Sequence, residues 1–528
     1  MGETLVSTFG SIFPLLRRED TINALWNGFE GSNGVLDRFR LRYFGDRNNH
    51  PIALLACGPG TGKSRFLQEV GGMLREQANS CNNDDAKNAF SKVLTINITF
   101  GNDSPASNTD VELGEASVGI RLLYEYFVST RMDKAKIGFR RFADQADVKS
   151  LHLATAMDVV WSDFFRGEST GALVLGIDEV NQLHQRSPEA LRGIVNAVGG
   201  LSCANPRFFV PILAGTIQGP IENMMMESTY LLLRLPLPLL TDEDVINIGS
   251  KLSVKSKEGD RTLRLTEDFV RHNSLFRRCI SDVGGMARGV EYFFKHFLSA
   301  VDQVKDTWPE DDAELTKALE YIDVMEVIEK VEGSLKDRYP FDTHVDYAIP
   351  VLTNAILDIP ISIDDTITVG NNSITYKTLR SAGILNLEPQ GKRDKFYVRV
   401  PYMWMVLLAK AASQSSKSPW RFWTTFLDPA GTISWGQWEK FNIKFWALRL
   451  SLLSAAGKTT ANLEELFPGA EFTSNCPDFK VMIPDFSEME MHELLNKYPE
   501  SQKVLDRNSQ NHSDLHTKFN KVFVNGKT

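Results

Sequence analysis

Residues 57–64 read Cys-Gly-Pro-Gly-Thr-Gly-Lys-Ser, and an apolar run from Ile52 to Ala56 leads directly into them. Glycines let backbone N–H groups point into a turn, and a helix that begins there adds partial positive charge, so such a segment can hold phosphates. Lys63 is placed to reach the β- and γ-phosphates of a nucleotide, and the Ser64 hydroxyl to coordinate Mg²⁺. We therefore expect ATP and Mg²⁺ as cofactors. The expected nucleotide-binding residues are Gly58, Pro59, Gly60, Thr61, Gly62, Lys63, Ser64 and Arg65.

The loop departs from the usual pattern at its first position. The full pattern G-x-x-x-x-G-K-[ST] begins with a glycine, and Cys57 stands there. A glycine-rich turn that merely precedes Lys-Ser is the alternative interpretation. The strand before the loop and the helix after it favour a phosphate site. Cys57 leaves open whether a bound nucleotide is hydrolysed.

A second stretch that can do chemistry runs from Ala172 to Glu179 and reads Ala-Leu-Val-Leu-Gly-Ile-Asp-Glu. Its apolar residues predict a parallel strand that is buried on both faces. Two acids at the end of such a strand are expected to have a cation nearby, because burial of unpaired charge is costly. Asp178 is expected to hold Mg²⁺ together with Ser64, and Glu179 to polarise the attacking water. The alternative is that Asp178 caps the next helix and Glu179 is a solvated acid of its first turn.

Further strands are needed to position these groups. The sequence predicts strands at 52–56, 93–100, 172–177, 208–214 and 230–235, with helical stretches between them. This pattern predicts an α/β fold with a parallel sheet, in which the alternating strand at 93–100 is peripheral and the strand order stays open. Thr216, with Gln218 as second candidate, follows one strand and could lie beside a γ-phosphate. A plain turn is the alternative there.

These motifs together resemble the AAA+ and STAND-type P-loop ATPases, with the loop as Walker A and the acidic strand end as Walker B. Those families add a helical lid with a basic residue, and residues 281–291 resemble its Gly-Gly-x-x-Arg helix start. The resemblance makes Arg288 the second sensor, an exposed arginine at a helix start being the alternative. Residues 14–20 resemble the Arg-Glu segment that packs near the base. Candidates for an arginine finger toward a neighbouring subunit are Arg207, Arg234 and Arg277.

A more specific resemblance covers roughly residues 10–300. The loop with Arg65-Phe-Leu after it, and Ile177-Asp-Glu-Val-Asn, look like the NTPase module of the Crinkler effectors and the related retrotransposon hot-spot proteins. This resemblance implies a nucleus-directed protein or one secreted into a host. It also implies a restriction-endonuclease-like C-terminal region, for which Glu439 and the Asp478-Phe-Lys480 segment are the matching residues. That region looks truncated or degenerate.

Bulk properties narrow the class of protein. The chain has 528 residues, a net charge of −9 and five scattered cysteines, which favour an intracellular, soluble protein with reduced thiols over a disulfide framework or a nonspecific nucleic-acid coat. Neither a secretory signal nor a membrane-spanning stretch is expected. The domains are predicted as an NTPase core (1–245), a helical lid (246–340), a winged-helix-like domain (341–412) and a smaller C-terminal α/β region (413–528).

The winged-helix interpretation depends on a helix from Ile374 to Gly383 and a hairpin with a basic turn at Lys392, Arg393 and Lys395. Such a wing contacts DNA phosphates in some proteins and is a structural or autoinhibitory element in others.

The sequence as a whole predicts a Mg²⁺-dependent ATPase that switches a C-terminal module. Lys63, Glu179, Thr216 and Arg288 are the expected catalytic residues, and a protein partner or a second copy is expected at the NTPase domain. One alternative is an interaction protein whose nucleotide does not turn over. The other is a DNA-acting ATPase with a nuclease-like C-terminal region.

Overall fold

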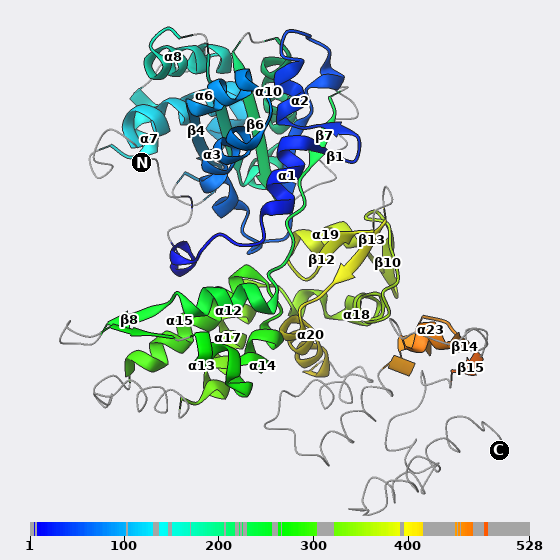
Figure 1. Ribbon diagram of the computed structural model, residues 1–528. Coiled ribbons are helices and arrows are strands. Elements are labelled where there is room, and N and C mark those ends of the chain that lie inside the picture. Colours follow the sequence, from blue (N-terminus) through cyan, green and yellow to red (C-terminus); the bar gives the residue numbers. More distant parts are fainter. Residues whose placement is uncertain are drawn as a thin grey trace, which may run out of the picture. The chain divides into compact units, whose positions relative to one another are not determined.

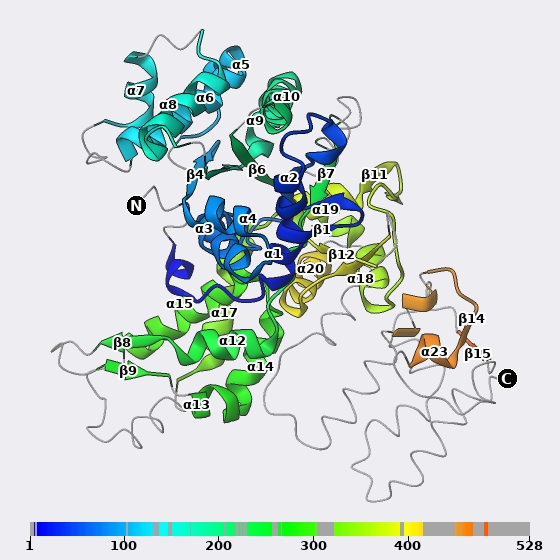
Figure 2. The ribbon, with the colours of Figure 1, turned by 45° about the horizontal axis from the view of Figure 1, so that its top comes forward.

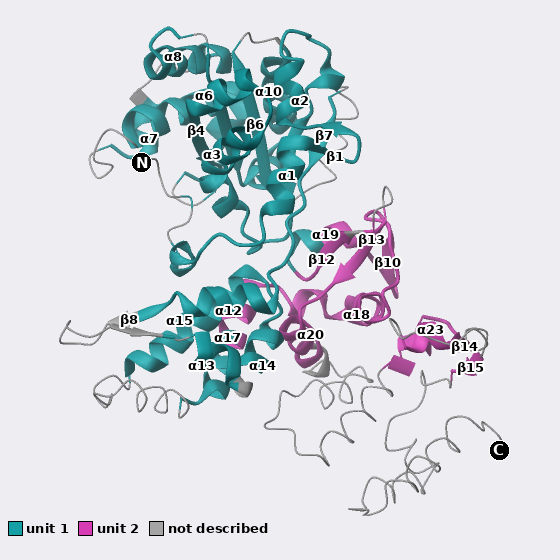
Figure 3. Cartoon of the chain, viewed as in Figure 1, with its two compact units in different colours: residues 1–331, 380–383 teal, residues 332–379, 384–528 magenta. Residues whose placement is uncertain are grey.

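The computed structural model divides into two compact units (Figure 3). Unit 1 comprises Met1–Val331 with Arg380–Gly383, and unit 2 comprises Glu332–Leu379 with Ile384–Thr528. The residues that the structure describes are 5, 8–101, 104–129, 137–145, 150–168, 170–204, 207–216, 221, 224, 230–255, 262–265, 267–303, 322–390, 395–414, 449–450, 452–454, 456–467 and 480–483.

A five-stranded parallel sheet in the order β4-β5-β6-β3-β7 forms the centre of unit 1 (Figure 1). All five predicted strands are confirmed, and with them the α/β fold class of this part. β4 lies at an edge, as its alternating pattern predicted, and β6 lies between β3 and β5, an order that the sequence left open. The bounds are β3 (Ile52–Ala56), β4 (Val93–Thr99), β5 (Ala172–Asp178), β6 (Phe208–Gly215) and β7 (Leu232–Arg234).

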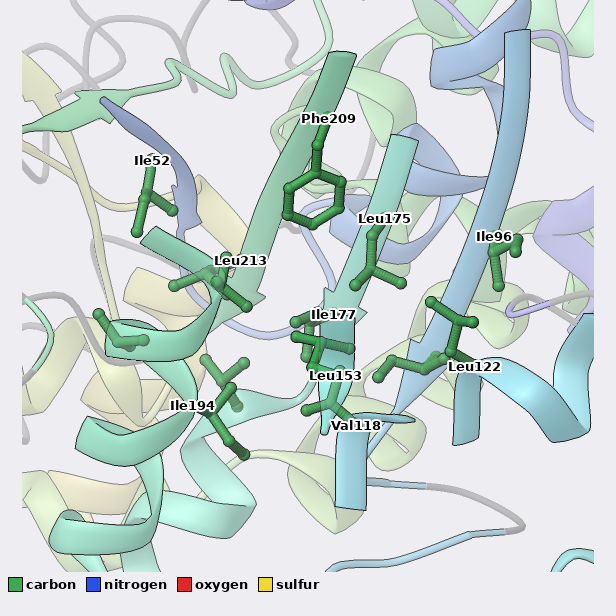
Figure 4. Close-up of a cluster of buried hydrophobic side chains, with 14 of the residues drawn as sticks. Ile52, Ile96, Val118, Leu122, Leu153, Leu175, Ile177, Ile194, Phe209 and Leu213 are labelled. Atoms are coloured by element: carbon green, nitrogen blue, oxygen red, sulfur yellow. The ribbon is translucent and has the colours of Figure 1, made fainter. Parts of the chain in front are cut away.

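Helices cover both faces of this sheet (Figure 2). One face carries α6 (Glu115–Leu123), α8 (Leu153–Phe165), α9 (Val180–Arg186) and α10 (Pro188–Ala204). The other carries α1 (Glu19–Asn27), α2 (Val35–Arg40), α3 (Lys63–Ser80) and α4 (Asp84–Ser91). Successive strand residues alternate between the two cores, which explains why the central strands are apolar throughout. Figure 4 shows the first core, with Val118, Leu122, Leu153 and Ile194 against Leu175, Ile177 and Phe209.

The remaining elements of unit 1 that precede its helical bundle are short. They are η1 (Phe9–Ile12), β1 (Gly28–Phe29), β2 (Ser32–Asn33), η2 (Arg47–Asn49), α5 (Asn108–Leu113), η3 (Tyr124–Ser129, a π-helix) and α7 (Phe139–Gln145). Within the described residues, no helix is both long and apolar enough to cross a membrane.

A helical bundle follows the sheet within unit 1. It comprises α12 (Asp242–Ser250), β8 (Ser253–Lys255), β9 (Thr262–Arg264), α13 (Glu267–His272), α14 (Ser274–Val283) and α15 (Ala287–Gln303). Thr241 is the N-cap of α12, because its hydroxyl accepts from the Asp244 N–H in a capping box. Gly285 has φ +71°, and a side chain there would meet the Leu240 carbonyl, so the turn before α15 requires glycine.

Beyond this bundle, α17 (Val324–Arg338) leads into unit 2. The predicted helix and antiparallel hairpin of residues 374–400 are confirmed, while the winged-helix interpretation stays a prediction. Lys392, Arg393, Glu439 and Asp478 lie outside the described residues, whereas Lys395 and Lys480 lie within them. The elements are η5 (Asp342–Tyr347), α18 (Ala348–Ile356), β10 (Thr366–Val369), β11 (Asn372–Thr375), α19 (Tyr376–Ser381), β12 (Asn386–Pro389), β13 (Phe396–Arg399), α20 (Tyr402–Gln414), β14 (Thr460–Asn462), α23 (Leu463–Leu466) and β15 (Lys480–Met482).

A buried ion pair fixes the segment that follows β4. Arg121 Nη2 lies 2.8 Å from Asp110 Oδ1, and both side chains are almost fully buried. Nη1 of the same guanidinium donates to the carbonyls of Thr99 and Ser104. The pair thus holds α5 and α6 to the carboxyl end of the edge strand.

We expect Asp110→Ala to lower the free energy of unfolding of unit 1 by about 3–5 kcal/mol, because it leaves the Arg121 charge buried without its partner. Asp37→Ala is the matched control. It removes an exposed partner of Arg40 and should change the same quantity by less than about 1 kcal/mol. Urea denaturation of both variants measures the difference, and equal effects would contradict this account.

Candidate functional site

The glycine-rich loop connects β3 to α3 at the carboxyl end of the sheet. Gly60 and Gly62 have φ values of 76° and 100°, which glycine adopts without strain. Gly62 is the N-cap of α3 and supplies no side-chain cap, so the first N–H groups of this 18-residue helix lack the usual side-chain acceptor. This arrangement is suited to bind an anion.

Cys57 replaces a glycine without strain in the loop. Neither Cys57 nor Gly58 has a positive φ. The backbone at the first loop position is therefore open to any residue. The departure from the usual pattern does not alter the loop geometry that Gly60 and Gly62 set.

Lys63 is the first residue of α3, and its ammonium group turns back onto the loop. Its Nζ donates to the carbonyls of Cys57 and Gly58, each at 2.9 Å. Burial lowers the pKa of Lys63, and the nearby acids Asp178 and Glu179 oppose that shift. Neutral carbonyls are weaker partners for an ammonium group than an anion is. A phosphate oxygen would therefore be a favourable further partner.

Ser64 and Asp178 join the loop to the acidic strand. Ser64 Oγ donates to Asp178 Oδ2 at 2.5 Å, and the carboxylate is only 1% exposed. Burial raises the pKa of Asp178, and the Ser64 hydrogen bond works against that shift. A hydroxyl and a buried carboxylate oxygen in contact fit Mg²⁺, which takes one or two protein ligands and fills its other positions with phosphate and water.

Glu179 follows β5 in a left-handed conformation, with φ 56°. It is the N-cap of α9, so the alternative role of Asp178 as that helix cap is wrong. The Glu179 side chain packs against Gly101, where a Cβ would lie 2.9 Å from Glu179 Cγ. A non-glycine residue held in this conformation stores strain, and such strain gathers at functional sites.

Thr216 lies directly after β6, between the ends of β3 and β5. Its backbone N–H donates to Asn181 Oδ1 at 3.3 Å, which ties the end of this strand to α9. The structure therefore brings Thr216 to the same carboxyl end of the sheet as Lys63 and Asp178. Gln218 lies outside the described residues.

Arg288 lies in the first turn of α15, as its resemblance to a lid arginine predicted. Its backbone N–H donates to the Gly60 carbonyl at 3.0 Å, so this turn contacts the glycine-rich loop directly. Its guanidinium is directed at Glu291 Oε2, 2.8 Å away.

Two further arginines of unit 1 contact the loop or the strand before it. Arg18 is buried and donates to the Thr61 carbonyl at 3.0 Å, and it also reaches the carbonyl of Pro238. Its Arg-Glu context was visible in the sequence, but the expected contact was with a base and not with the loop backbone. Arg380, in the short segment that belongs to unit 1, donates to the Ala56 carbonyl. Nothing in its sequence context distinguishes it.

The candidate finger arginines stay undecided. Arg207 is paired with Asp158 and Arg234 with Glu30, while Arg277 lies exposed on α14. An ion pair within the chain competes with any role toward a second copy, which disfavours Arg207 and Arg234 as fingers.

No family model matches the chain. Crinkler effector protein 108 of Phytophthora sojae is 23% identical over 284 residues, which are 50% of this chain and 30% of that protein. The matched part is thus less than a third of that relative's own length. The predicted resemblance to the Crinkler effectors is confirmed as a distant one.

The solved structures that are similar to the chain include a Walker-type ATPase, an ORC2 protein and a domain of a replication initiation protein. The Walker-type ATPase PABY2304 of Pyrococcus abyssi has 11% identity and a TM-score of 0.36, over 76% of this chain and 99% of that one. The ADP form of ORC2 of Aeropyrum pernix has 12% identity and a TM-score of 0.39, over 77% and 96%. Domain III of DnaA of Thermotoga maritima has 11% identity and a TM-score of 0.26, over 60% and 97%.

Gly62, the N-cap of α3, and Gly72, in the middle of that helix, give a matched test of the loop geometry. Gly62→Ala should destabilise unit 1 by about 1–3 kcal/mol, because φ is +100° there and a Cβ would lie 2.9 Å from Arg18 Nη2. Gly72→Ala, where a Cβ meets nothing within 4 Å, should stabilise it by about 0.5–1 kcal/mol. Thermal unfolding measures both. A neutral Gly62→Ala would show that the loop is not held as described.

Proposed function

We propose that the chain is a Mg²⁺-dependent ATPase whose nucleotide state switches a C-terminal module. The hydrogen bond from Ser64 Oγ to Asp178 Oδ2, beside the buried Lys63 ammonium, carries this proposal. It joins a phosphate-binding loop to a buried carboxylate, which is the combination that a nucleotide with its metal requires.

In the proposed site, Lys63 and the N–H groups at the start of α3 bind the phosphates. Ser64 and Asp178 hold Mg²⁺, which when bound neutralises charge on the phosphate oxygens. The raised pKa of Asp178 supports this role, since a cation favours the ionised form that burial disfavours. Burial of Lys63 keeps water from competing for its ammonium group.

Glu179 is proposed to orient the attacking water and accept its proton. The left-handed backbone and the contact with Gly101 limit where the Glu179 carboxylate can lie. Thr216 and Arg288 are proposed to respond to the γ-phosphate, one from the end of β6 and the other from the lid helix. Arg288 is suited to couple binding of the γ-phosphate to the position of the lid helix, because its backbone N–H donates to the Gly60 carbonyl of the loop.

The distant similarity to a Crinkler effector supports an effector-like use of this switch. The alternative, an interaction protein that binds nucleotide without turnover, depended on Cys57. Since the backbone at Cys57 does not need glycine, that residue gives no reason to expect lost turnover. An assay of phosphate release beside an assay of binding separates the two functions.

Two variants test the proposed roles. Lys63→Ala should weaken ATP binding by about 10- to 100-fold, the loss of a charge-assisted contact. Glu179→Gln should keep ATP bound while phosphate release falls by about 10²- to 10⁴-fold, because the base is lost. Binding is measured by calorimetry and turnover by released phosphate, both with Mg²⁺.

Exposed residues provide controls for these variants. Lys87→Ala and Glu189→Gln each remove a partner from a surface pair on a helix, and both should retain parental binding and turnover. The assignment is wrong if Lys63→Ala and Glu179→Gln hydrolyse ATP as fast as these controls. Tight binding with no turnover in the parent chain would instead support the interaction protein.

A further inference from the structure

The lid arginine already has an anionic partner within its own helix. Arg288 Nη1 lies 2.8 Å from Glu291 Oε2, one turn further along α15. The Glu291 side chain is 9% exposed and that of Arg288 is 26% exposed, so the pair is shielded from solvent on the glutamate side. A buried carboxylate holds its cation more firmly than an exposed one does.

The other oxygen of this carboxylate binds the N-terminal segment. Gly10 N donates to Glu291 Oε1 at 3.1 Å, and a Cβ on Gly10 would lie 3.3 Å from Glu291 Cδ. The close approach leaves no room for water between the carboxylate and the Gly10 backbone. Glu291 therefore has two partners, the Arg288 guanidinium and the Gly10 N–H.

The same N-terminal segment also contacts the helix of the phosphate loop. Arg65 Nη1 donates to the Ser11 carbonyl at 2.8 Å, and the Phe13 ring packs edge-on against Phe294 of α15. Residues 10–13 thus join the first turn of α3 to the face of α15 that carries Glu291. This contact fixes the position of Glu291 relative to the loop.

We propose that Glu291 is a positioning residue that binds Arg288 and competes with the γ-phosphate of a bound nucleotide for its guanidinium. The inference rests on the proposed function, since it assigns a regulator to the same site. Arg288 must leave Glu291 to reach a phosphate, and the Glu291 carboxylate then keeps only the Gly10 N–H. Binding of a triphosphate is therefore opposed by the charge of Glu291, whereas binding of a diphosphate, which does not recruit Arg288, is not.

Glu291→Gln tests this competition, because glutamine keeps an oxygen that accepts from Gly10 N–H and loses the charge that holds Arg288. The variant should bind ATP about three- to tenfold more tightly, while its affinity for ADP changes by less than about twofold. A purely structural role predicts a different result, namely that ATP and ADP affinities fall together with the unfolding temperature. Calorimetry with each nucleotide and Mg²⁺ measures the ratio.

A double variant isolates the arginine. In an Arg288→Ala background, Glu291→Gln should no longer change the ratio of ATP to ADP affinity, because the competing cation is gone. Glu267→Gln is the matched control, since it removes an exposed partner of Arg271 on α13 and should leave both affinities unchanged.

The outcomes separate this inference from the proposed function. If the parent chain binds neither nucleotide, or if Lys63→Ala binds both as well as the parent does, the proposed function fails and this inference with it. If Lys63→Ala loses binding while Glu291→Gln leaves the ATP to ADP ratio unchanged, only the inference is overturned. A ratio that shifts equally with and without Arg288 also overturns it.

Discussion

The burial of a single ammonium group, that of Lys63, is the constraint on which the site depends. A cation that is 6% exposed needs acceptors around it, and the turn of the glycine-rich loop provides the carbonyls of Cys57 and Gly58. The acids at the end of β5 provide opposite charge nearby. The sheet order places β3 and β5 on either side of β6, which brings the loop and these acids to the same end of the sheet.

Donors from distant parts of unit 1 occupy the loop carbonyls. The Gly60 carbonyl accepts from the backbone of Arg288, and the Thr61 carbonyl accepts from the guanidinium of Arg18. With its carbonyls engaged in this way, the loop has its acceptors paired while the N–H groups at the start of α3 stay available. Rigidity of this kind reduces the ordering that a ligand must impose, which favours affinity.

The sequence predicted the elements of this site better than their connections. Local patterns were enough to predict the strand at 172–177, the glycine-rich loop that ends at Lys63 and the helix start that carries Arg288. Each of these depends on residues that are neighbours in the chain. Strand order and the loop contact of Arg18 depend on residues far apart in sequence, and the pairing of Asp110 with Arg121 depends on how two separate helices pack. No periodicity encodes such contacts. Several C-terminal predictions, Glu439 among them, lie outside the described residues.

The strand order also has a consequence for how the chain is made. Within the sheet, β3 lies between β6 and β7, and both of these strands follow it by a long stretch of sequence. During synthesis on the ribosome, the apolar strand β3 has neither of its neighbours to pair with until residues 208–234 have been synthesised. Non-local pairing of this kind slows folding and leaves strand edges open to wrong partners. The strand that precedes the phosphate loop is therefore synthesised before either of its neighbours, and it gains its place in the sheet only after both have followed.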